Sequence, residues 1–298
     1  MKITRIDIVG LGALGTMYAG YFSEHIGREN VRVLMDAERL KKYQMNGSWV
    51  NGKQLDLNAV DAAMETEPAQ LMVFAVKYSG LRAAMDSVAH LIGDGTVIMS
   101  LLNGIRSEHE LGERFGMEKI IYCTAQKMDA TREGSHVRYV SHGDLALGIT
   151  QNGRRKNLDA VTDLLDRTAF PYFLPDDMQK ALWSKLVCNV GVNQAVAYFE
   201  GTYATVQTEG EPRTMMLDAM RECVAVGQAE GVALSEDDVV YWRDIVDRLA
   251  PEGLPSMRQD AKAGRKTEVE LFAGTVCELG RKHGIATPVN NVFLKAFM

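Results

Sequence analysis

Apolar residues in the first half of the chain come in short β-branched runs, and a helical pattern follows most of them. Residues 3–9 form the first run, glycines follow at positions 10, 12 and 15, and a helix is expected from Ala13 to Ile26. Further buried strands are expected at Val31–Met35, Leu71–Val76, Thr96–Leu101, Ile120–Thr124 and Pro171–Leu174. Strands that alternate with helices predict a doubly wound, mainly parallel sheet, an α/β Rossmann-like domain.

Two local pairings are expected beside this sheet. Asn51-Gly52, between Trp49-Val50 and Leu55–Leu57, is typical of a hairpin turn. Val137–Val140 and Leu145–Ile149 are expected to form an antiparallel pair around residues 142–144.

The pattern changes after Pro175, where apolar residues recur at helical spacing and strand-like runs end. Helices are expected at Met178–Phe199, Pro212–Glu230, Glu236–Leu249, Ser256–Lys266, Glu268–His283 and Pro288–Met298, with Ser235 and Thr287 as N-caps. The prediction is therefore a dinucleotide-binding domain over residues 1–175 and an all-α domain over residues 176–298.

Charge and cysteine content argue against some classes of partner and indicate the compartment. The 298 residues carry a net charge of -6, which argues against nucleic acid or an anionic membrane as a partner but not against a small anionic substrate. The chain is expected to have neither a signal peptide nor a membrane span. Four separated cysteines without a C-x-x-C pair indicate reduced thiols and a cytoplasmic protein; they are Cys123, Cys188, Cys223 and Cys277.

The glycine turn after the first strand predicts a dinucleotide site. The segment Gly10-Leu11-Gly12-Ala13-Leu14-Gly15 fits G-x-G-x-x-G between a strand and a helix. Gly10 allows the turn, Gly12 leaves room for a phosphate, and Gly15 lets the helix approach the strand. A glycine turn that binds no ligand is the weaker interpretation, because the motif lies between a strand and a helix, as it does in dinucleotide-binding domains.

Three residues at strand ends are candidate cofactor contacts, each with a simpler alternative. Asp36 after the second strand can bind ribose hydroxyls, which favours NAD(H), or it can cap a helix over Ala37–Met45. Lys77 is either a ligand contact or a solvated lysine. Asn103 before Gly104 can hydrogen-bond near a nicotinamide or simply form a turn.

The chemistry is expected on the first helix of the second domain. Lys185, Asn189 and Asn193 are spaced four apart among apolar residues, so they form a polar stripe on a largely buried helix. Such a stripe favours a substrate site over a structural polar network. Ser256 opens a later helix and can bind a carboxylate or act as an N-cap, and Glu268 starts another helix, where the dipole favours its charge.

Together these residues resemble the ketopantoate reductase (2-dehydropantoate 2-reductase) family over essentially the whole chain. The similarity rests on Gly10-x-Gly12-x-x-Gly15, Lys77, Asn103-Gly104, Ala130–Gly134, Lys185-x-x-x-Asn189-x-x-x-Asn193, Ser256-Met257-x-Gln259 and Thr267-Glu268. The resemblance implies a Rossmann domain followed by an all-α domain of the 6-phosphogluconate dehydrogenase C-terminal type.

The resemblance also implies NAD(P)H-dependent reduction of ketopantoate to pantoate, a step toward pantothenate and coenzyme A. Lys185 would be the general acid, and Asn189, Asn193 and Ser256 would bind the substrate. The cofactor would contact residues 10–15, Lys77, Asn103, Ala130 and Glu268. No metal is needed for this reaction. The sequence does not determine the oligomeric state, but the apolar C-terminal helices could pair two subunits in a homodimer.

Two residues depart from the family. Asp36 stands where the family often has an arginine that binds the NADP 2′-phosphate, so NADH is an alternative to NADPH, although Arg39, Lys41 and Lys42 can compensate. Tyr203 stands where some members have a substrate-binding asparagine, which leaves another branched 2-oxo acid as a rival substrate. A non-catalytic dinucleotide sensor is the rival from another functional class.

Overall fold

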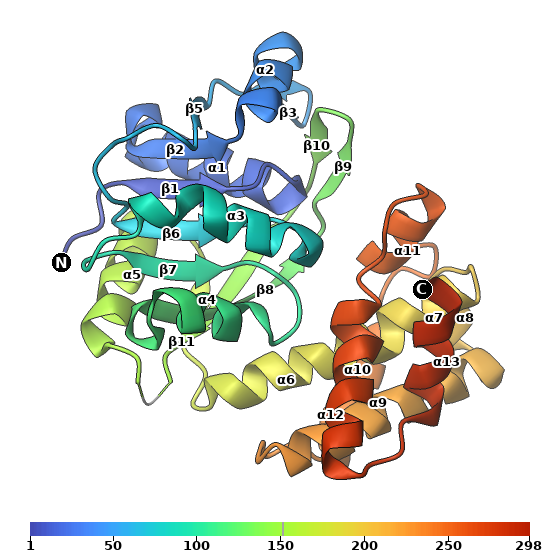
Figure 1. The fold of residues 1–298 in the computed structure, drawn as a ribbon. Helices are drawn as coiled ribbons and strands as arrows, with labels where there is room; N and C mark the ends of the chain where they lie inside the picture. The colour runs from blue at the N-terminus through green and yellow to red at the C-terminus, as the bar shows by residue number, and fades with distance from the viewer. Residues whose placement is uncertain (151) are drawn as a thin grey trace. The chain divides into compact units, whose positions relative to one another are not determined.

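The computed structural model describes residues 1–150 and 152–298, which form two compact units (Figure 1). The first unit comprises residues 1–102 and 106–178. The second comprises residues 179–298 together with the short segment 103–105, which the chain contributes from within the first half.

The first unit is built on a sheet with strand order β12-β11-β8-β7-β6-β1-β2-β5. The strands are β1 Ile6–Val9, β2 Val31–Met35, β5 Asn58–Asp61, β6 Leu71–Phe74, β7 Val97–Ser100, β8 Ile120–Met128, β11 His142–Gly148 and β12 Tyr172–Phe173. From β5 to β8 all neighbours are parallel, and β11 is antiparallel to β8. The predicted doubly wound, mainly parallel sheet is confirmed.

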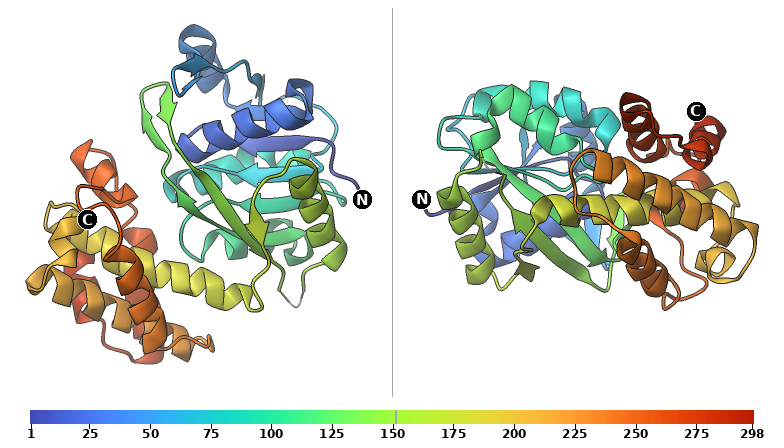
Figure 2. Two further views of the ribbon diagram at one scale, coloured as in Figure 1. Left: turned by 180° about the vertical axis from the view of Figure 1, so that it is seen from behind. Right: turned by 90° about the horizontal axis from the view of Figure 1, so that it is seen from below.

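Helices cover both faces of this sheet (Figures 1 and 2). They are α1 Ala13–Ile26, α2 Ala37–Asn46, α3 Leu81–Val88, α4 Ser107–Phe115 and α5 Arg155–Arg167, with short 3-10 turns η1 Arg28–Asn30, η2 Tyr78–Gly80, η3 Ala89–Leu91 and η4 Met117–Lys119. Helix α4 had no counterpart among the predicted elements.

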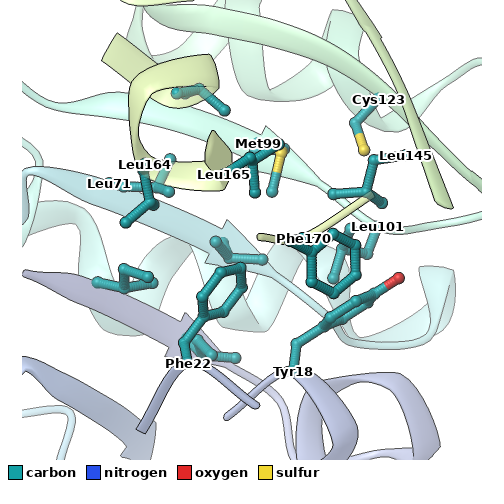
Figure 3. Packing of buried hydrophobic residues seen from close by; sticks show 14 of the residues in the cluster. Tyr18, Phe22, Leu71, Met99, Leu101, Cys123, Leu145, Leu164, Leu165 and Phe170 are labelled. Atoms are coloured by element: carbon teal, nitrogen blue, oxygen red, sulfur yellow. The ribbon is translucent and has the colours of Figure 1, made fainter. Parts of the chain in front are cut away.

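The core of the first unit holds α1 in place. The Phe170 ring lies 5.3 Å from the Tyr18 ring and 5.8 Å from the Phe22 ring, centre to centre, which anchors α1 to the segment after α5 (Figure 3). The Arg32 Nε donates to Asp7 Oδ1 at 2.7 Å, and this buried pair joins β1 to β2. The two strands that lead to the glycine turn and to Asp36 are therefore fixed to each other.

The predicted pairing of residues 137–140 with 145–149 is wrong. Strand β10 (His136–Arg138) pairs with β9 (Thr131–Glu133) and β3 (Trp49–Val50), whereas β11 pairs with β8. The cause is the turn at Asp129, whose Oδ1 accepts the N–H groups of Val140 and Ser141 at 3.0 and 2.8 Å. This separates β10 from β11.

A smaller sheet contains the predicted hairpin in a shifted form. Its order is β4-β3-β10-β9, and β3 pairs with β4 (Lys53–Gln54) across Asn51-Gly52. Residues 55–57 were expected as the second hairpin strand, but they follow β4 and lead into β5 of the large sheet.

The second unit consists of helices, as predicted. They are α6 Met178–Cys188, η5 Asn189–Asn193, α7 Gln194–Tyr198, α8 Tyr203–Gln207, α9 Glu211–Ala229, α10 Glu236–Val246, α11 Ser256–Lys262, η6 Glu270–Gly274, α12 Thr275–His283 and α13 Pro288–Phe297. Elements η5 and η6 are π-helical. Ser235 caps α10 through a capping box, as predicted. Across the described ranges, every helix falls short of the length or apolar character needed to cross a membrane.

Candidate active site

The turn between β1 and α1 has the geometry of a phosphate cradle. Gly10 has a φ of +103°, and a Cβ on it would lie 2.7 Å from the Ala75 carbonyl oxygen. Gly15 packs so closely on the Gly10 carbonyl that any side chain would collide with it. A Cβ on Gly12 would meet only Ala75 O, at 3.7 Å, so the start of α1 is open to a ligand. Gly12 offers no side-chain cap to the first N–H groups of α1, and they suit a pyrophosphate.

The other candidate cofactor residues of the first unit lie at loop positions. Asp36 is the N-cap of α2: its Oδ1 accepts Arg39 N–H at 2.8 Å, and its Oδ2 lies 3.4 Å from Arg39 Nε. The carboxylate remains exposed, so capping does not prevent ligand contact. Lys77 is exposed just after β6, and Ala130 is half-buried between β8 and β9.

The polar stripe lies on one continuous helical run formed by α6, η5 and α7. Asn189 and Asn193 are buried, Lys185 is half-buried, and Asn193 Nδ2 donates to Asn189 Oδ1 at 3.3 Å. Among the described residues, the buried Asn189 Nδ2 finds no hydrogen-bond partner. A buried donor left unpaired costs about 1–3 kcal/mol, so this amide is suited to a ligand oxygen.

The π-helical turn η5 keeps the stripe on one face. In an α-helix a step of four residues overshoots a full turn, because a turn holds about 3.6 residues. In the wider π-turn the same step falls short of a full turn. The drift from Lys185 to Asn189 is therefore partly reversed between Asn189 and Asn193.

Trp242 on α10 supports the Lys185 side chain. Lys185 Nζ lies 5.3 Å from the centre of the indole ring, and Trp242 Nε1 donates to the Ser184 hydroxyl at 3.0 Å. The ring is only 8% exposed. The electron-rich face attracts the ammonium, and the Ser184 bond fixes the ring orientation.

Asn103 and Glu268 meet within the second unit. Asn103 Nδ2 donates to Glu268 Oε2 at 2.9 Å. The next residue, Gly104, has a φ of +85° and packs on Leu271 of η6, where a Cβ would lie 2.8 Å from the Leu271 side chain. The Glu268 carbonyl accepts the N–H groups of Leu271 and Phe272, so Glu268 lies at the start of its helical run, as expected.

Ser256 and Tyr203 are placed around the same helical run. Ser256 is exposed at the first position of α11, and α11 packs against η5 and α7. It follows the N-cap Pro255, so it is not itself the N-cap. Burial raises the pKa of Tyr203 to about 12, and its ring packs on Gly253. Burial also raises the pKa of the neighbouring Cys188 thiol, which disfavours a thiolate there.

Comparison with known proteins decides the family. Residues 6–152 match the family described as Ketopantoate reductase PanE/ApbA, and residues 177–298 match its C-terminal domain. The chain belongs to the ketopantoate reductase family. It is accordingly an oxidoreductase.

Relatives and solved structures match the chain over nearly its whole length. The 2-dehydropantoate 2-reductase of Halobacterium salinarum is 28% identical over 293 residues, covering 96% of this chain and 95% of its own. The structure of 2-dehydropantoate 2-reductase from Geobacter metallireducens GS-15 is 25% identical with a TM-score of 0.87, covering 98% of both chains. D-mandelate dehydrogenase with NADH and anilino(oxo)acetate shares the fold, with a TM-score of 0.89 at 21% identity, covering 98% of this chain and 97% of its own.

In this reductase the second unit brings Lys185, Asn189 and Asn193 onto one helical run and pairs Asn103 with Glu268. Sequence reasoning missed Trp242, because a tryptophan on an amphipathic helix gives no sign of its partner across the bundle. Within the described residues no three His, Cys, Asp or Glu side chains group as a metal site.

Proposed function

We propose that the protein reduces ketopantoate to pantoate with a nicotinamide dinucleotide and uses Lys185 as the general acid. The observation that carries this proposal is the helical run on which the Lys185 ammonium stands one turn before the unpartnered buried amide of Asn189. Membership of the ketopantoate reductase family supports it. The reaction would serve pantothenate and coenzyme A synthesis in the cytoplasm.

The charged lysine and the neutral polar residues of the site have different roles in the reaction. When bound, the reduced nicotinamide supplies a hydride to the carbonyl carbon of the 2-oxo acid. Negative charge then grows on the carbonyl oxygen, where the Lys185 ammonium stabilises it and donates the proton that completes the hydroxyl. Asn189, Asn193 and Ser256 bind the carboxylate and hydroxyl of the substrate and so fix which face of the ketone reacts.

Cofactor contacts are proposed at the glycine turn and at four further residues. The open N-terminus of α1 would bind the pyrophosphate, and Lys77, Asn103, Ala130 and Glu268 would complete the contacts. The family implies NADPH. The exposed Asp36 carboxylate favours NADH, because it suits ribose hydroxyls and repels a 2′-phosphate.

A second candidate is reduction of another branched or aromatic 2-oxo acid. Tyr203 favours it, because its half-buried ring lies beside Gly253 and beside Cys188, the residue before Asn189. Some family members have an asparagine at the position of Tyr203. An aromatic ring there offers apolar contact in place of an amide hydrogen bond.

The test is a panel assay of the purified chain. Ketopantoate, 2-oxoisovalerate and phenylglyoxylate are each supplied with NADPH and with NADH, and coenzyme oxidation is followed by absorbance. We expect ketopantoate to give the highest kcat/KM. A higher value for another acid would favour the second candidate, and coenzyme binding without oxidation by any acid would indicate a sensor.

A further inference from the structure

Gln194 is fully buried at the junction of the two π-helical turns. Its Nε2 donates to Val190 O at 2.7 Å and to Asn290 Oδ1 at 3.1 Å, and its Oε1 accepts Ala273 N–H at 2.9 Å. The side chain is 0% exposed. One amide thus links η5, η6 and α13.

The bond to Ala273 compensates for the π-turn in η6. Gly274 N–H donates to Val269 O at 3.0 Å, five residues back. In an α-helix that carbonyl would accept the N–H of Ala273 instead. The π-turn therefore displaces the Ala273 N–H, and Gln194 Oε1 takes it.

The bond to Val190 compensates for the π-turn in η5. An α-helix would pair Val190 O with the backbone N–H of residue 194, but that N–H is directed to Gly191 O. The side chain of the same residue reaches back to Val190 O instead. Gln194 therefore satisfies one displaced backbone group in each of the two turns, and neither group bears the cost of being buried without a partner.

The surrounding network fixes the orientation of the Gln194 amide. Asn290 Nδ2 donates to Ala219 O at 3.2 Å and to Glu222 Oε2 at 2.8 Å, so Asn290 must present its Oδ1 to Gln194. Only Nε2 of Gln194 can meet that oxygen, which leaves Oε1 for Ala273.

We propose that Gln194 is a positioning residue for the reaction, an inference that rests on the proposed function. Loss of a π-turn changes the helical register by one residue, about 100° of rotation. In η5 the drift from Lys185 to Asn189 would then continue to Asn193 instead of being partly reversed. In η6 the change of register turns Glu268, with its partner Asn103, relative to α12. Gln194 thereby keeps the acid, the substrate amides and Glu268 in one arrangement.

The test compares Gln194→Met with Gln207→Met in the full-length protein. Gln207 is a matched control, because its Nε2 also donates to two backbone carbonyls of the second unit, Val246 O at 2.8 Å and Leu249 O at 2.9 Å, away from both π-turns. Both variants should lose stability in urea unfolding. Only Gln194→Met should raise KM for the 2-oxo acid and lower kcat/KM by about 10- to 100-fold.

Hydrogen exchange supplies a readout that does not depend on turnover. Gln194→Met should speed exchange in peptides spanning 189–198 and 269–277, whereas Gln207→Met should not. Equal kinetics and equal exchange in the two variants would overturn the proposal. If wild type turns over no 2-oxo acid, the proposed function fails while the exchange result still tests whether Gln194 holds both turns.

A second variant covers the case in which Gln194→Met does not fold. Gln194→Glu keeps an acceptor for Ala273 N–H but loses the donor to Val190 O. Exchange should then rise in 189–198 more than in 269–277, and KM should rise. Wild-type exchange and KM in this variant would contradict the proposal.

Discussion

The Lys185 ammonium lies over the face of the Trp242 ring, with Nζ 5.3 Å from the ring centre, and the indole N–H is tied to Ser184 on the helix that carries Lys185. A lysine on four rotatable bonds is a poor proton donor unless something limits where its end group goes. The ring attracts the charged end group and the serine prevents the ring from rotating. The acid is thus held at a defined position on α6.

Trp242→Leu should therefore impair the chemical step. The lost attraction is about 0.5–2 kcal/mol, which corresponds to a kcat about 2- to 30-fold lower. Steady-state kinetics at saturating substrate measure it. Trp49→Leu is the control, since Trp49 lies on β3 of the first unit and should leave kcat near the wild-type value. An unchanged kcat in Trp242→Leu would remove the supporting role of the ring.

Asn189→Leu should weaken substrate binding as well as stability. The variant loses the bond from Asn193 Nδ2 to Asn189 Oδ1, so it should lose about 1–3 kcal/mol of unfolding free energy. KM for the 2-oxo acid should rise at least about 10-fold, because a charge-assisted bond to the substrate is lost.

Asn157→Leu is the matched control for that variant. Asn157 is also buried, but its Nδ2 donates to Glu118 O at 3.0 Å in the first unit. It should lose about 1–3 kcal/mol of stability with KM unchanged. If Asn189→Leu lost stability to the same degree and bound substrate normally, Asn189 would be structural.

Asp36→Asn tests the choice of coenzyme. Asparagine caps a helix as well as aspartate does, so α2 should keep its start while the negative charge is removed. The ratio of kcat/KM for NADPH to that for NADH should rise by about 10-fold or more, since one repulsive charge near the 2′-phosphate disappears.

Removal of Arg39 should change the NADPH-to-NADH ratio of kcat/KM in the opposite direction. Arg39→Ala should lower the same ratio, because Arg39 Nε lies 3.4 Å from the Asp36 carboxylate and its positive charge would attract a 2′-phosphate held there. Ratios that do not move in either variant would place coenzyme discrimination elsewhere.

Glu108 makes stability depend on pH. Burial raises the pKa of its carboxyl from 4.5 to about 7, and Ser107 provides its hydrogen-bond donor at 2.9 Å. Between these values the folded protein holds a proton that the unfolded chain releases, so the free energy of unfolding falls as pH rises from about 4.5 to 7, by about 3 kcal/mol.

Glu108→Gln keeps the acceptor for Ser107 and removes the titration. Urea unfolding of wild type and variant at pH 5 and pH 7.5 should show that the variant loses less stability over this interval. Other titrating groups are common to both proteins and cancel in the comparison. Equal losses of stability in wild type and variant would mean that Glu108 does not contribute to the pH dependence.

The sequence pattern predicted those parts of the fold and the site that depend on residues close together in the chain. The glycines at 10, 12 and 15 identified the β1–α1 turn because each meets a local steric demand, and the four-residue spacing of Lys185, Asn189 and Asn193 identified the stripe. The partner of β10 was predicted wrongly, because strand partners are chosen by distant segments such as β3. The π-turns could not be predicted either, since their displaced backbone groups depend on Gln194, which directly follows η5 in the chain and reaches η6 only through a tertiary contact.

The contact between Asn103 and Glu268 shows the same limit. The two residues are far apart in sequence, and nothing in residues 103–105 reveals that this segment packs with the helices of the second unit. The packing of Gly104 on Leu271 is what places this segment among the helices of the second unit.

The role of Lys185 as general acid is tested by the kcat of Lys185→Ala with the preferred 2-oxo acid and coenzyme, measured beside Lys180→Ala. Lys180 is on the same helix and lies 3.8 Å from Asp238, so its loss removes a cation without removing the proposed acid. We expect Lys185→Ala to lower kcat by about 100-fold or more and Lys180→Ala to change it by less than about 2-fold. A kcat near the wild-type value in Lys185→Ala would show that Lys185 is not the general acid.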